Sequence, residues 1–306
     1  MKNCLKCKNL IGQPLEALYG LHKSCFIESF GPTDTTEFKD VDPKKSSSPT
    51  SPNSNHEIIK QRNTFFHGNY LKYSARLDQT DYILKVQEPR YPELPFVEYL
   101  CNQLAELLKI TVPPYHLINF NGRITFVTRN FMQDYTGTLH HIYKYIKAGE
   151  QSHNCEEIIK IILTQTAKLA DVAKFIEICL FDALIGNNDR HGRNLGIIET
   201  ASIKKLAPMY DNPSCLGIEE DFFLLSDANP SGSIWTKASK EPKPIDYINE
   251  FQRLGYETIV KQFCNKVISQ SSNIMNTINN TEISPIRKNA LTKLLQKRKG
   301  EFENVR

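Results

Sequence analysis

Hydrophobic and polar positions follow a strand-like rhythm in the first half of the chain. Two apolar runs, 115–118 and 124–127, flank the dipeptide Asn121-Gly122. Because Asn-Gly favours the tight turn of a β-hairpin, these runs predict an antiparallel pair of strands. An earlier pair of β-prone stretches, 65–77 and 82–86, flanks a charged turn and predicts a second hairpin.

Helical periodicity appears between the two hairpins and again from about residue 139 onward. Residues 96–109 place their apolar side chains on one helix face. Two further stretches, 158–163 and 170–184, are apolar enough to form buried helices. The tail, 289–299, has an apolar helix face and a basic face that we expect to be solvated. The pattern predicts an α+β protein that is β-rich first and helical afterwards.

Composition and charge narrow the classes of protein further. The 306 residues are 40% hydrophobic and carry a net charge of +4, which is too mild to indicate direct nucleic-acid binding. No apolar run of about eighteen residues occurs, so no membrane span is expected. Since the N-terminal residues lack a signal peptide's apolar segment, we expect a cytoplasmic location with reduced cysteines. Delivery into another cell stays open.

The first 30 residues hold a group of potential metal ligands. Cys4 and Cys7 form one close pair, and His22 and Cys25 form another, each with two intervening residues. Such a set can bind Zn²⁺ tetrahedrally. A metal-free knuckle packed by its own apolar residues is the alternative. Residues 31–56, rich in serine and proline, then predict a flexible linker.

A polar loop lies between two apolar stretches, within residues 184–198. It contains Asp189 and, five residues later, Asn194; a further acid, Asp211, follows a short apolar run. Phosphoryl transfer uses these residue types, because one aspartate accepts the proton of the attacking hydroxyl while an asparagine and a second aspartate bind Mg²⁺. A polar turn with two ordinary surface aspartates is the alternative interpretation.

Upstream residues supply the other parts of a nucleotide site in the expected order. Lys85 ends a short apolar strand and could bind phosphates, and Glu98, in the first turn of the next helix, could hold it. Gly68 would let backbone amides approach phosphate oxygens. The segment Arg129–Phe131 would connect two lobes where an adenine meets the backbone. A surface lysine and a solvated acid are the alternatives for the first two residues.

Several motifs together resemble the HipA family of serine/threonine kinases, over roughly residues 60–220. They are Tyr82-Ile83-Leu84-Lys85 with Tyr91-Pro92-Glu93-Leu94-Pro95 and Glu98, Thr111-Val112-Pro113-Pro114, Asn188-Asp189-Arg190-His191-x-x-Asn194, and Pro208-Met209-Tyr210-Asp211. The resemblance implies a bilobal, protein-kinase-like α+β fold. Its small β-rich N-lobe would comprise residues 57–132 and its larger helical C-lobe residues 133–306.

The resemblance also implies a role for each matching residue. Asp189 would be the catalytic base, and Asn194 and Asp211 would bind Mg²⁺. Lys85 would bind the phosphates of ATP, and His191 would lie near the γ-phosphate. The implied activity is that of a kinase toxin that phosphorylates a protein of translation, such as an aminoacyl-tRNA synthetase of the tryptophanyl type.

The start of the chain is similar to the split form of the family, HipT of the HipBST systems. Full-length members carry an additional N-terminal subdomain, and residues 1–56 are too short and too polar to supply it. In the split form that subdomain is a separate small protein, HipS, and HipB is the DNA-binding antitoxin. The resemblance therefore implies HipS-like and HipB-like partners.

One segment departs from the family pattern. The Gly-rich loop usually contains serines that become autophosphorylated, whereas here the aligned residues are Phe65-Phe66-His67-Gly68. His67 and Gly68 are assigned to the nucleotide, and Ser54, the nearest upstream serine, is our hypothesis for autophosphorylation. Two other interpretations stay open: a pseudokinase that only binds partners, and a small-molecule phosphotransferase of the aminoglycoside type.

Overall fold

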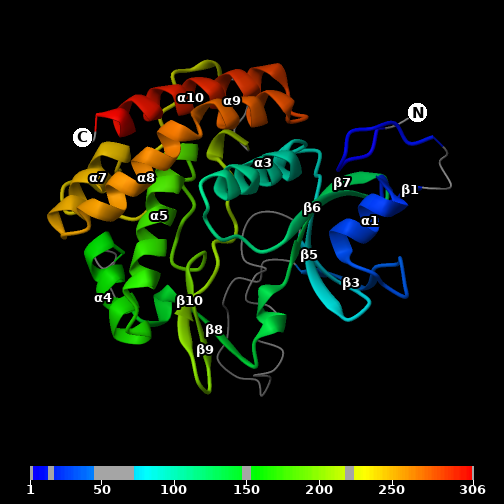
Figure 1. The fold of residues 1–306 in the computed structure, drawn as a ribbon, viewed down its shortest axis with the longest axis horizontal. Coiled ribbons are helices and arrows are strands. Elements are labelled where there is room, and N and C mark those ends of the chain that lie inside the picture. Colours follow the sequence, from blue (N-terminus) through cyan, green and yellow to red (C-terminus); the bar gives the residue numbers. More distant parts are fainter. Residues whose placement is uncertain (1–2, 13–16, 45–71, 147–152, 218–223, 305–306) are drawn as a thin grey trace. The chain divides into compact units, whose positions relative to one another are not determined.

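The structure, a computed structural model, describes residues 3–12, 17–44, 72–146, 153–217 and 224–304. The chain forms two compact units, which Figure 1 shows as ribbons. The N-terminal unit comprises Met1–Tyr99 and Pro113–Tyr135, and the C-terminal unit comprises Leu100–Val112 and Thr136–Arg306. The sequence placed a lobe boundary between residues 132 and 133, but it did not separate Leu100–Val112 from the first lobe.

A five-stranded antiparallel sheet organises the N-terminal unit (Figure 1). Its strands in spatial order are β3 (Lys39–Lys44), β4 (Lys72–Leu77), β5 (Thr80–Val86), β7 (Arg123–Arg129) and β6 (Tyr115–Phe120). Both predicted hairpins are confirmed where they are described, as β4–β5 and β6–β7. Asn121 and Gly122 have φ values of 50° and 79°, the left-handed conformation that a two-residue hairpin turn requires.

One face of this sheet is covered by the chain's own N-terminal residues. These form β1 (Ala17–Leu18), β2 (Leu21–His22) and α1 (Lys23–Phe30). Aromatic rings join the layers: Phe30 lies 5.5 Å from Tyr82 between ring centroids, and Tyr19 lies 6.2 Å from Phe120. The described residues of the knuckle predicted for residues 1–30 therefore pack directly on the sheet.

The prediction of a flexible linker over residues 31–56 is wrong for the first part of that segment. Phe38 is buried and packs against Tyr82, with 5.8 Å between ring centroids, and β3 pairs with β4 as an edge strand. The prediction rested on local composition, whereas the burial of Phe38 and the pairing of β3 depend on residues much later in the chain. Residues 45–56 lie outside the described part.

The helix predicted over 96–109 is α3 (Leu94–Leu107). Pro95 lies in its first turn, where the missing amide hydrogen costs nothing because early amides have no partner within the helix. The helix ends at Leu107, and the chain turns at Lys109, whose φ of 60° is left-handed. This helix supplies residues to both units, since the division between them falls after Tyr99.

The C-terminal unit is mainly helical, as the sequence predicts (Figure 1). Its described helices of more than one turn are α4 (Cys155–Thr166), α5 (Leu169–Ile185), α7 (Pro244–Arg253), α8 (Glu257–Ser269), α9 (Ser271–Asn280) and α10 (Pro285–Glu303). Every residue of α5 from Ile178 to Ile185 is buried, and the helix contacts α4, α7, α8 and α10. The central position of α5 fixes the loop that follows it.

A small sheet accompanies these helices, in the order β10 (Lys204–Leu206), β9 (Gly196–Thr200) and β8 (Gly137–His141). Strand β8 lies at the start of the region where we expected only helical patterns to dominate. Its two histidines and its glycine give no apolar alternation, and it is a strand because β9, far along the chain, supplies its hydrogen bonds.

Helix α10 confirms the apolar face predicted for the tail, because Ala290, Leu291, Leu294 and Leu295 are buried. The expectation that its basic residues are all solvated is wrong for Arg298, which is 1% exposed. Arg298 donates to the carbonyl of Ala183, near the end of α5. In the described parts of the chain, the helices are too short or too polar to cross a bilayer.

Candidate functional site

A buried ion pair joins β5 to α3 in the N-terminal unit. The ammonium of Lys85 contacts the carboxylate of Glu98, and their side chains are 5% and 1% exposed. Removing two charges from water is costly unless they are paired, so the pair fixes the lysine against the helix. The structure thus brings together the two residues that the sequence assigned to phosphate binding and to its support.

A second buried lysine, which the sequence analysis missed, lies beside Lys85. Lys72 on β4 is the antiparallel register partner of Lys85, so both side chains project from the same face of the sheet. On that face the Lys85 ammonium lies 5.8 Å from the centre of the Phe126 ring. Two adjacent lysines create a positive potential that suits phosphate oxygens. Lys72 follows no motif that we recognised, so only the strand register reveals it.

The predicted adenine connector follows β7. Arg129 ends that strand, and Phe131 is buried at the start of the short helix η2 (Phe131–Asp134). Between them, Asn130 lines a cavity of about 460 Å³ within the N-terminal unit, and Ile83 of β5 also lines it. Cavities of this size accommodate small organic ligands. The assignment of Arg129 and Phe131 to a nucleotide stays a prediction.

Three predicted residues lie outside the described part of the chain. These are His67 and Gly68, assigned to the nucleotide, and Ser54, the hypothetical autophosphorylation site. The departure at Phe65-Phe66-His67-Gly68 lies there too. Their roles therefore stay predictions from the sequence.

In the C-terminal unit, the polar loop begins where α5 ends. Gly186 caps the helix with a left-handed φ of 73°, which turns the chain away from the helix axis. The Asn187 amide then donates to Asp182 on the last turns of α5 (2.8 Å) and accepts the backbone N–H of Asp189 (3.0 Å). One side-chain amide thus ties the backbone of Asp189 to the central helix.

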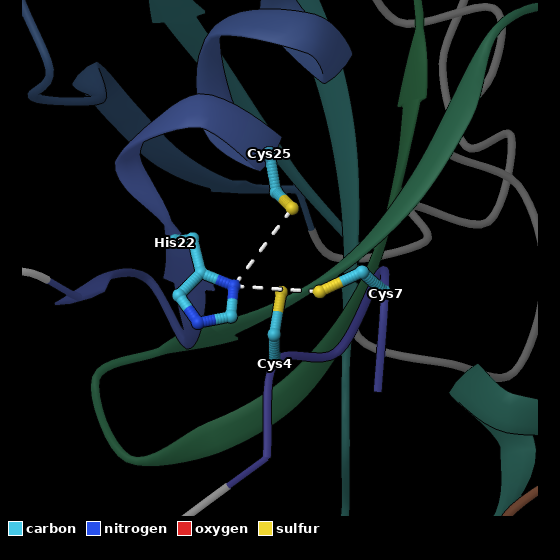
Figure 2. A group of neighbouring side chains, drawn as sticks. All are labelled: Cys4, Cys7, His22 and Cys25. Atoms are coloured by element: carbon cyan, nitrogen blue, oxygen red, sulfur yellow. Dashed lines mark hydrogen bonds between the residues drawn. The ribbon is translucent and has the colours of Figure 1, made fainter. Parts of the chain in front are cut away.

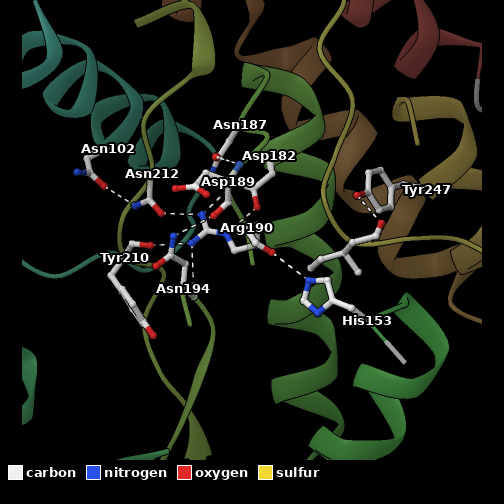
Figure 3. A network of polar contacts seen from close by, with 11 residues as sticks. Asn102, His153, Asp182, Asn187, Asp189, Arg190, Asn194, Tyr210, Asn212 and Tyr247 are labelled. Carbon is white, nitrogen blue, oxygen red and sulfur yellow. Dashed lines mark hydrogen bonds and ion pairs between the residues drawn. The ribbon is translucent and has the colours of Figure 1, made fainter. Parts of the chain in front are cut away.

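Arg190 is the centre of a buried network, shown in Figure 3. It is 2% exposed, and its guanidinium forms two hydrogen bonds with the carboxylate of Asp182 (2.8 and 3.0 Å). Its remaining donors contact the carbonyls of Asn194 (3.0 Å) and Tyr210 (2.6 Å) and the side-chain oxygen of Asn212 (2.8 Å). All five N–H groups of the arginine are used. Burial alone would lower the pKa of Arg190, but the adjacent Asp182 carboxylate outweighs it and raises that pKa.

This network joins the two segments that carry the predicted catalytic residues. Asn194, a predicted Mg²⁺ ligand, and Tyr210, which precedes the other predicted ligand Asp211, both give their carbonyls to Arg190. The Asn194 side chain donates to the carbonyl of Asp189 (2.9 Å), so its oxygen points the opposite way. One carboxylate oxygen of Asp189 lies 3.6 Å from Nε2 of His191.

The residue types in this region fit a hard cation. Asp211 offers carboxylate oxygens and Asn194 an amide oxygen, which are the ligands that Mg²⁺ prefers. Asp211 also has a left-handed φ of 60°, a conformation that costs a non-glycine residue energy and that persists only where the surroundings impose it. The structure thus holds Asp211 in an unusual conformation beside the buried network.

The sequence analysis named the predicted ligands but missed the residues that support the segments carrying them. These supporting residues are Asp182, Asn187, Arg190, Asn212 and its hydrogen-bond partner Asn102. One signal was present: Asp182 is an acid within the buried, otherwise apolar second half of α5. A carboxylate in such a position needs a buried partner. No pattern in one sequence names Arg190 as that partner.

The predicted metal ligands at the start of the chain also come together (Figure 2). The ligand atoms of Cys4, Cys7, His22 and Cys25 all lie within 4.8 Å of one another. We call these four residues the Cys₃His cluster. Burial alone would raise the pKa of the Cys4 thiol, but backbone hydrogen bonds from residues including Cys7 and His22 outweigh it and lower that pKa to about 6.

Comparison with known proteins assigns the family. Residues 58–277 match the HipA-like C-terminal domain. The chain belongs to the HipA-like C-terminal domain family. A curated relative from Sinorhizobium fredii, named "Putative kinase Y4mE", is 28% identical over 43% of this chain and 35% of its own length. Another from Haemophilus influenzae, named "Putative kinase", is 33% identical over 44% of this chain and 45% of its own length. The matches thus span less than half of either relative.

Solved structures show the same fold at low sequence identity. The Helicobacter pylori proinflammatory kinase CtkA has a TM-score of 0.64 and 17% identity, covering 76% of this chain and 92% of that one. Shewanella oneidensis HipA, solved with HipB and its operator DNA, has a TM-score of 0.53 and 15% identity, covering 76% and 61%. The predicted α+β, kinase-like fold is confirmed.

Proposed function

We propose that this chain is a serine/threonine protein kinase that uses ATP and Mg²⁺. The observation that carries the proposal is the Arg190 network. It binds the backbone on both sides of the predicted site, at Asn194 and at Tyr210. A buried, fully hydrogen-bonded arginine of this kind gives the side chains of Asp189, Asn194 and Asp211 a fixed backbone, as phosphoryl transfer requires.

Each predicted site residue of the C-terminal unit then has a role in the reaction. The side chain of Asp189, which is 58% exposed, accepts the proton of the attacking serine or threonine hydroxyl. Asn194 and Asp211 bind Mg²⁺, which neutralises phosphate charge. His191, next to the Asp189 carboxylate, lies near the γ-phosphate and donates a hydrogen bond to it.

The N-terminal unit supplies the nucleotide-binding residues of this proposal. Lys85, held by Glu98, binds phosphate oxygens, and Lys72 adds positive charge on the same sheet face. The cavity lined by Asn130 and Ile83 supports adenine binding near the Arg129–Phe131 connector. Gly68 and His67 would cover the phosphates.

We further propose that the kinase is the toxin of a HipBST-like system. The resemblance of the N-terminal part to the split form, HipT, supports a HipS-like small protein and a HipB-like DNA-binding antitoxin as partners. The similarity in fold to a HipA that was solved with HipB and operator DNA agrees with the second partner. The proposed substrate is a translation protein, with tryptophanyl-tRNA synthetase the first candidate, and Ser54 is the proposed autophosphorylation site.

The test is phosphate transfer by the purified chain with Mg²⁺ and labelled ATP, with and without tryptophanyl-tRNA synthetase. We expect label on a synthetase serine or threonine and on a peptide that contains Ser54. Replacing the general base, Asp189→Asn, should lower transfer by about 10²–10⁴-fold and leave ATP binding intact. Asp227→Asn, at an exposed surface acid, is the matched control and should transfer normally.

The outcomes separate the alternatives. ATP binding without transfer to any protein would favour the pseudokinase and refute the kinase proposal if a panel of synthetases also stays unlabelled. Label on an aminoglycoside or another small hydroxyl compound would favour the small-molecule phosphotransferase. Transfer that Asp189→Asn leaves unchanged would show that the base is misassigned.

A further inference from the structure

The Cys₃His cluster serves no step of the proposed phosphoryl transfer. Its four residues come from two segments, 4–7 and 22–25. The backbone N–H of Leu5 donates to the carbonyl of Gly20 (3.0 Å), in the turn between β1 and β2, and so holds the first segment beside the second. Cys4 and Cys25 are buried, whereas Cys7 is exposed. All three sulfurs are free thiols. Figure 2 shows the sulfurs and the imidazole of His22 pointing toward one another.

The spacing of the ligand atoms agrees with tetrahedral zinc. With Zn–S bonds of about 2.3 Å and Zn–N bonds of about 2.0 Å, tetrahedral angles put sulfurs about 3.8 Å apart and a sulfur about 3.5 Å from the nitrogen. Nδ1 of His22 lies 3.4 Å from the Cys7 sulfur and 3.9 Å from the Cys25 sulfur. No ligand atom of the cluster lies more than 4.8 Å from another.

A hydrogen bond sets the protonation of the histidine. Nε2 of His22 lies 3.1 Å from the carbonyl oxygen of Leu10, and a carbonyl can only accept, so Nε2 carries the hydrogen. In the neutral ring, Nδ1 then has its lone pair directed at the three sulfurs. Histidines that bind metals commonly donate their other N–H to a carbonyl in this way.

We propose that the Cys₃His cluster binds one structural Zn²⁺. Three thiolates and an imidazole are soft or borderline ligands, which favour zinc over Mg²⁺. Four protein ligands complete a tetrahedron and leave no position for substrate, so the ion is structural. A disulfide between two of the cysteines would not explain why the third thiol and Nδ1 of His22 lie at the same place.

The zinc would hold the N-terminal segment on the outer layer of the sheet. Phe26, which follows the ligand Cys25, is fully buried and stacks near Tyr19 at 6.1 Å between ring centroids. Tyr19 in turn packs on Phe120 of β6. A segment this short buries little apolar surface of its own, and metal binding contributes to its folding. The ion therefore stabilises the layer that covers the strands of the N-terminal unit.

The first test is the metal content of the full chain, purified under reducing conditions with zinc supplied and excess metal removed. We expect about one zinc per chain. Replacing Zn²⁺ by Co²⁺ should give the visible absorption of tetrahedral cobalt and a near-ultraviolet band from thiolate ligands. This spectrum is measured on the unaltered protein, so it does not depend on whether a variant folds.

Two matched variants locate the ion. Cys7→Ala removes an exposed thiol, so it should weaken zinc binding by about 100-fold or more while disturbing little packing. Cys264→Ala removes a buried thiol of α8, outside the cluster, and should keep the zinc and the cobalt spectrum. A chelator should lower the melting temperature of the Cys264→Ala protein and leave that of Cys7→Ala unchanged.

Three results would overturn the proposal. They are a zinc content far below one per chain after reconstitution, a cobalt spectrum without thiolate bands, and equal zinc binding by Cys7→Ala and the unaltered chain. Iron in place of zinc would also contradict it. The test is independent of the proposed kinase activity, because Asp189→Asn should bind zinc as the unaltered chain does even if no phosphate is ever transferred.

Discussion

Replacing Arg190 by lysine tests whether the buried network determines the geometry of the predicted catalytic loop. The substitution keeps the positive charge but removes the planar fork that contacts Asp182, Asn194, Tyr210 and Asn212 at the same time. A lysine ammonium has three donors at one point. It cannot bind both oxygens of Asp182 and also reach two carbonyls on opposite sides.

The structure permits an approximate magnitude. Breaking a buried ion pair by changing one partner costs about 3–5 kcal/mol, and the retained charge favours the lower figure of about 3 kcal/mol. In a protein of this size, 1 kcal/mol shifts the melting temperature by about 2–4 °C, so we expect a decrease of about 6–12 °C. Displacing the loop by about an ångström should also lower the proposed kinase activity by about 100-fold.

Thermal unfolding and phosphate transfer, each measured with Mg²⁺ titrated, are the assays. Arg193→Lys is the matched control, because Arg193 lies in the same loop with an exposed side chain and its substitution should change stability by less than about 0.5 kcal/mol. If Arg190→Lys melts like Arg193→Lys, the network does not support the loop and our reasoning is refuted. If it is less stable but fully active, only the link from network to catalysis is refuted.

Three further substitutions test other parts of the structure. Glu98→Gln removes the buried anion of the ion pair and should cost about 3–5 kcal/mol in urea unfolding, whereas Glu106→Gln, at an exposed position of the same helix, should cost less than about 1 kcal/mol. Burial lowers the pKa of His116 from 6.5 to about 4. As the pH falls, the unfolded chain therefore binds the proton before the folded one. The contribution of neutral His116 to the free energy of unfolding is fully present above pH 6.5, and up to about 3 kcal/mol of it is lost as the pH falls through about 4. His116→Leu should make the free energy of unfolding less dependent on pH in this range. Gly186→Ala adds a methyl group 2.8 Å from a proline side chain, at a left-handed φ, and should cost about 2 kcal/mol or more, against about 1 kcal/mol for Gly255→Ala, which has a left-handed φ and open space; equal melting temperatures would contradict this.

Local signals in the sequence predicted those parts of the fold that depend on neighbouring residues. The Asn121-Gly122 turn and the apolar runs of α5 were read correctly because turn conformation and helical burial are specified within a few positions. The Cys₃His cluster was also predicted from local signals, because each of its two pairs of ligands has only two intervening residues. Lys85 and Glu98 were paired because they belong to a recognisable strand-and-helix order.

The missed features depend on contacts between distant positions. Strand β8 has little apolar alternation and pairs with β9 about sixty residues later, which no local pattern encodes. Arg298 was assigned to a solvated helix face because basic residues usually lie there, but it donates to the carbonyl of Ala183 at the far end of α5. Arg190 lay within the quoted motif, and its role became visible only with its four partners in place.

The complete use of the Arg190 donors has a consequence for regulation. An arginine that senses phosphorylation must have N–H groups ready to meet the new phosphate. On Arg190 every N–H is already bonded to Asp182, Asn194, Tyr210 or Asn212. A phosphate on a neighbouring segment would have to displace these buried bonds. A phosphorylation switch in this protein would therefore need cations other than Arg190 to bind the new phosphate.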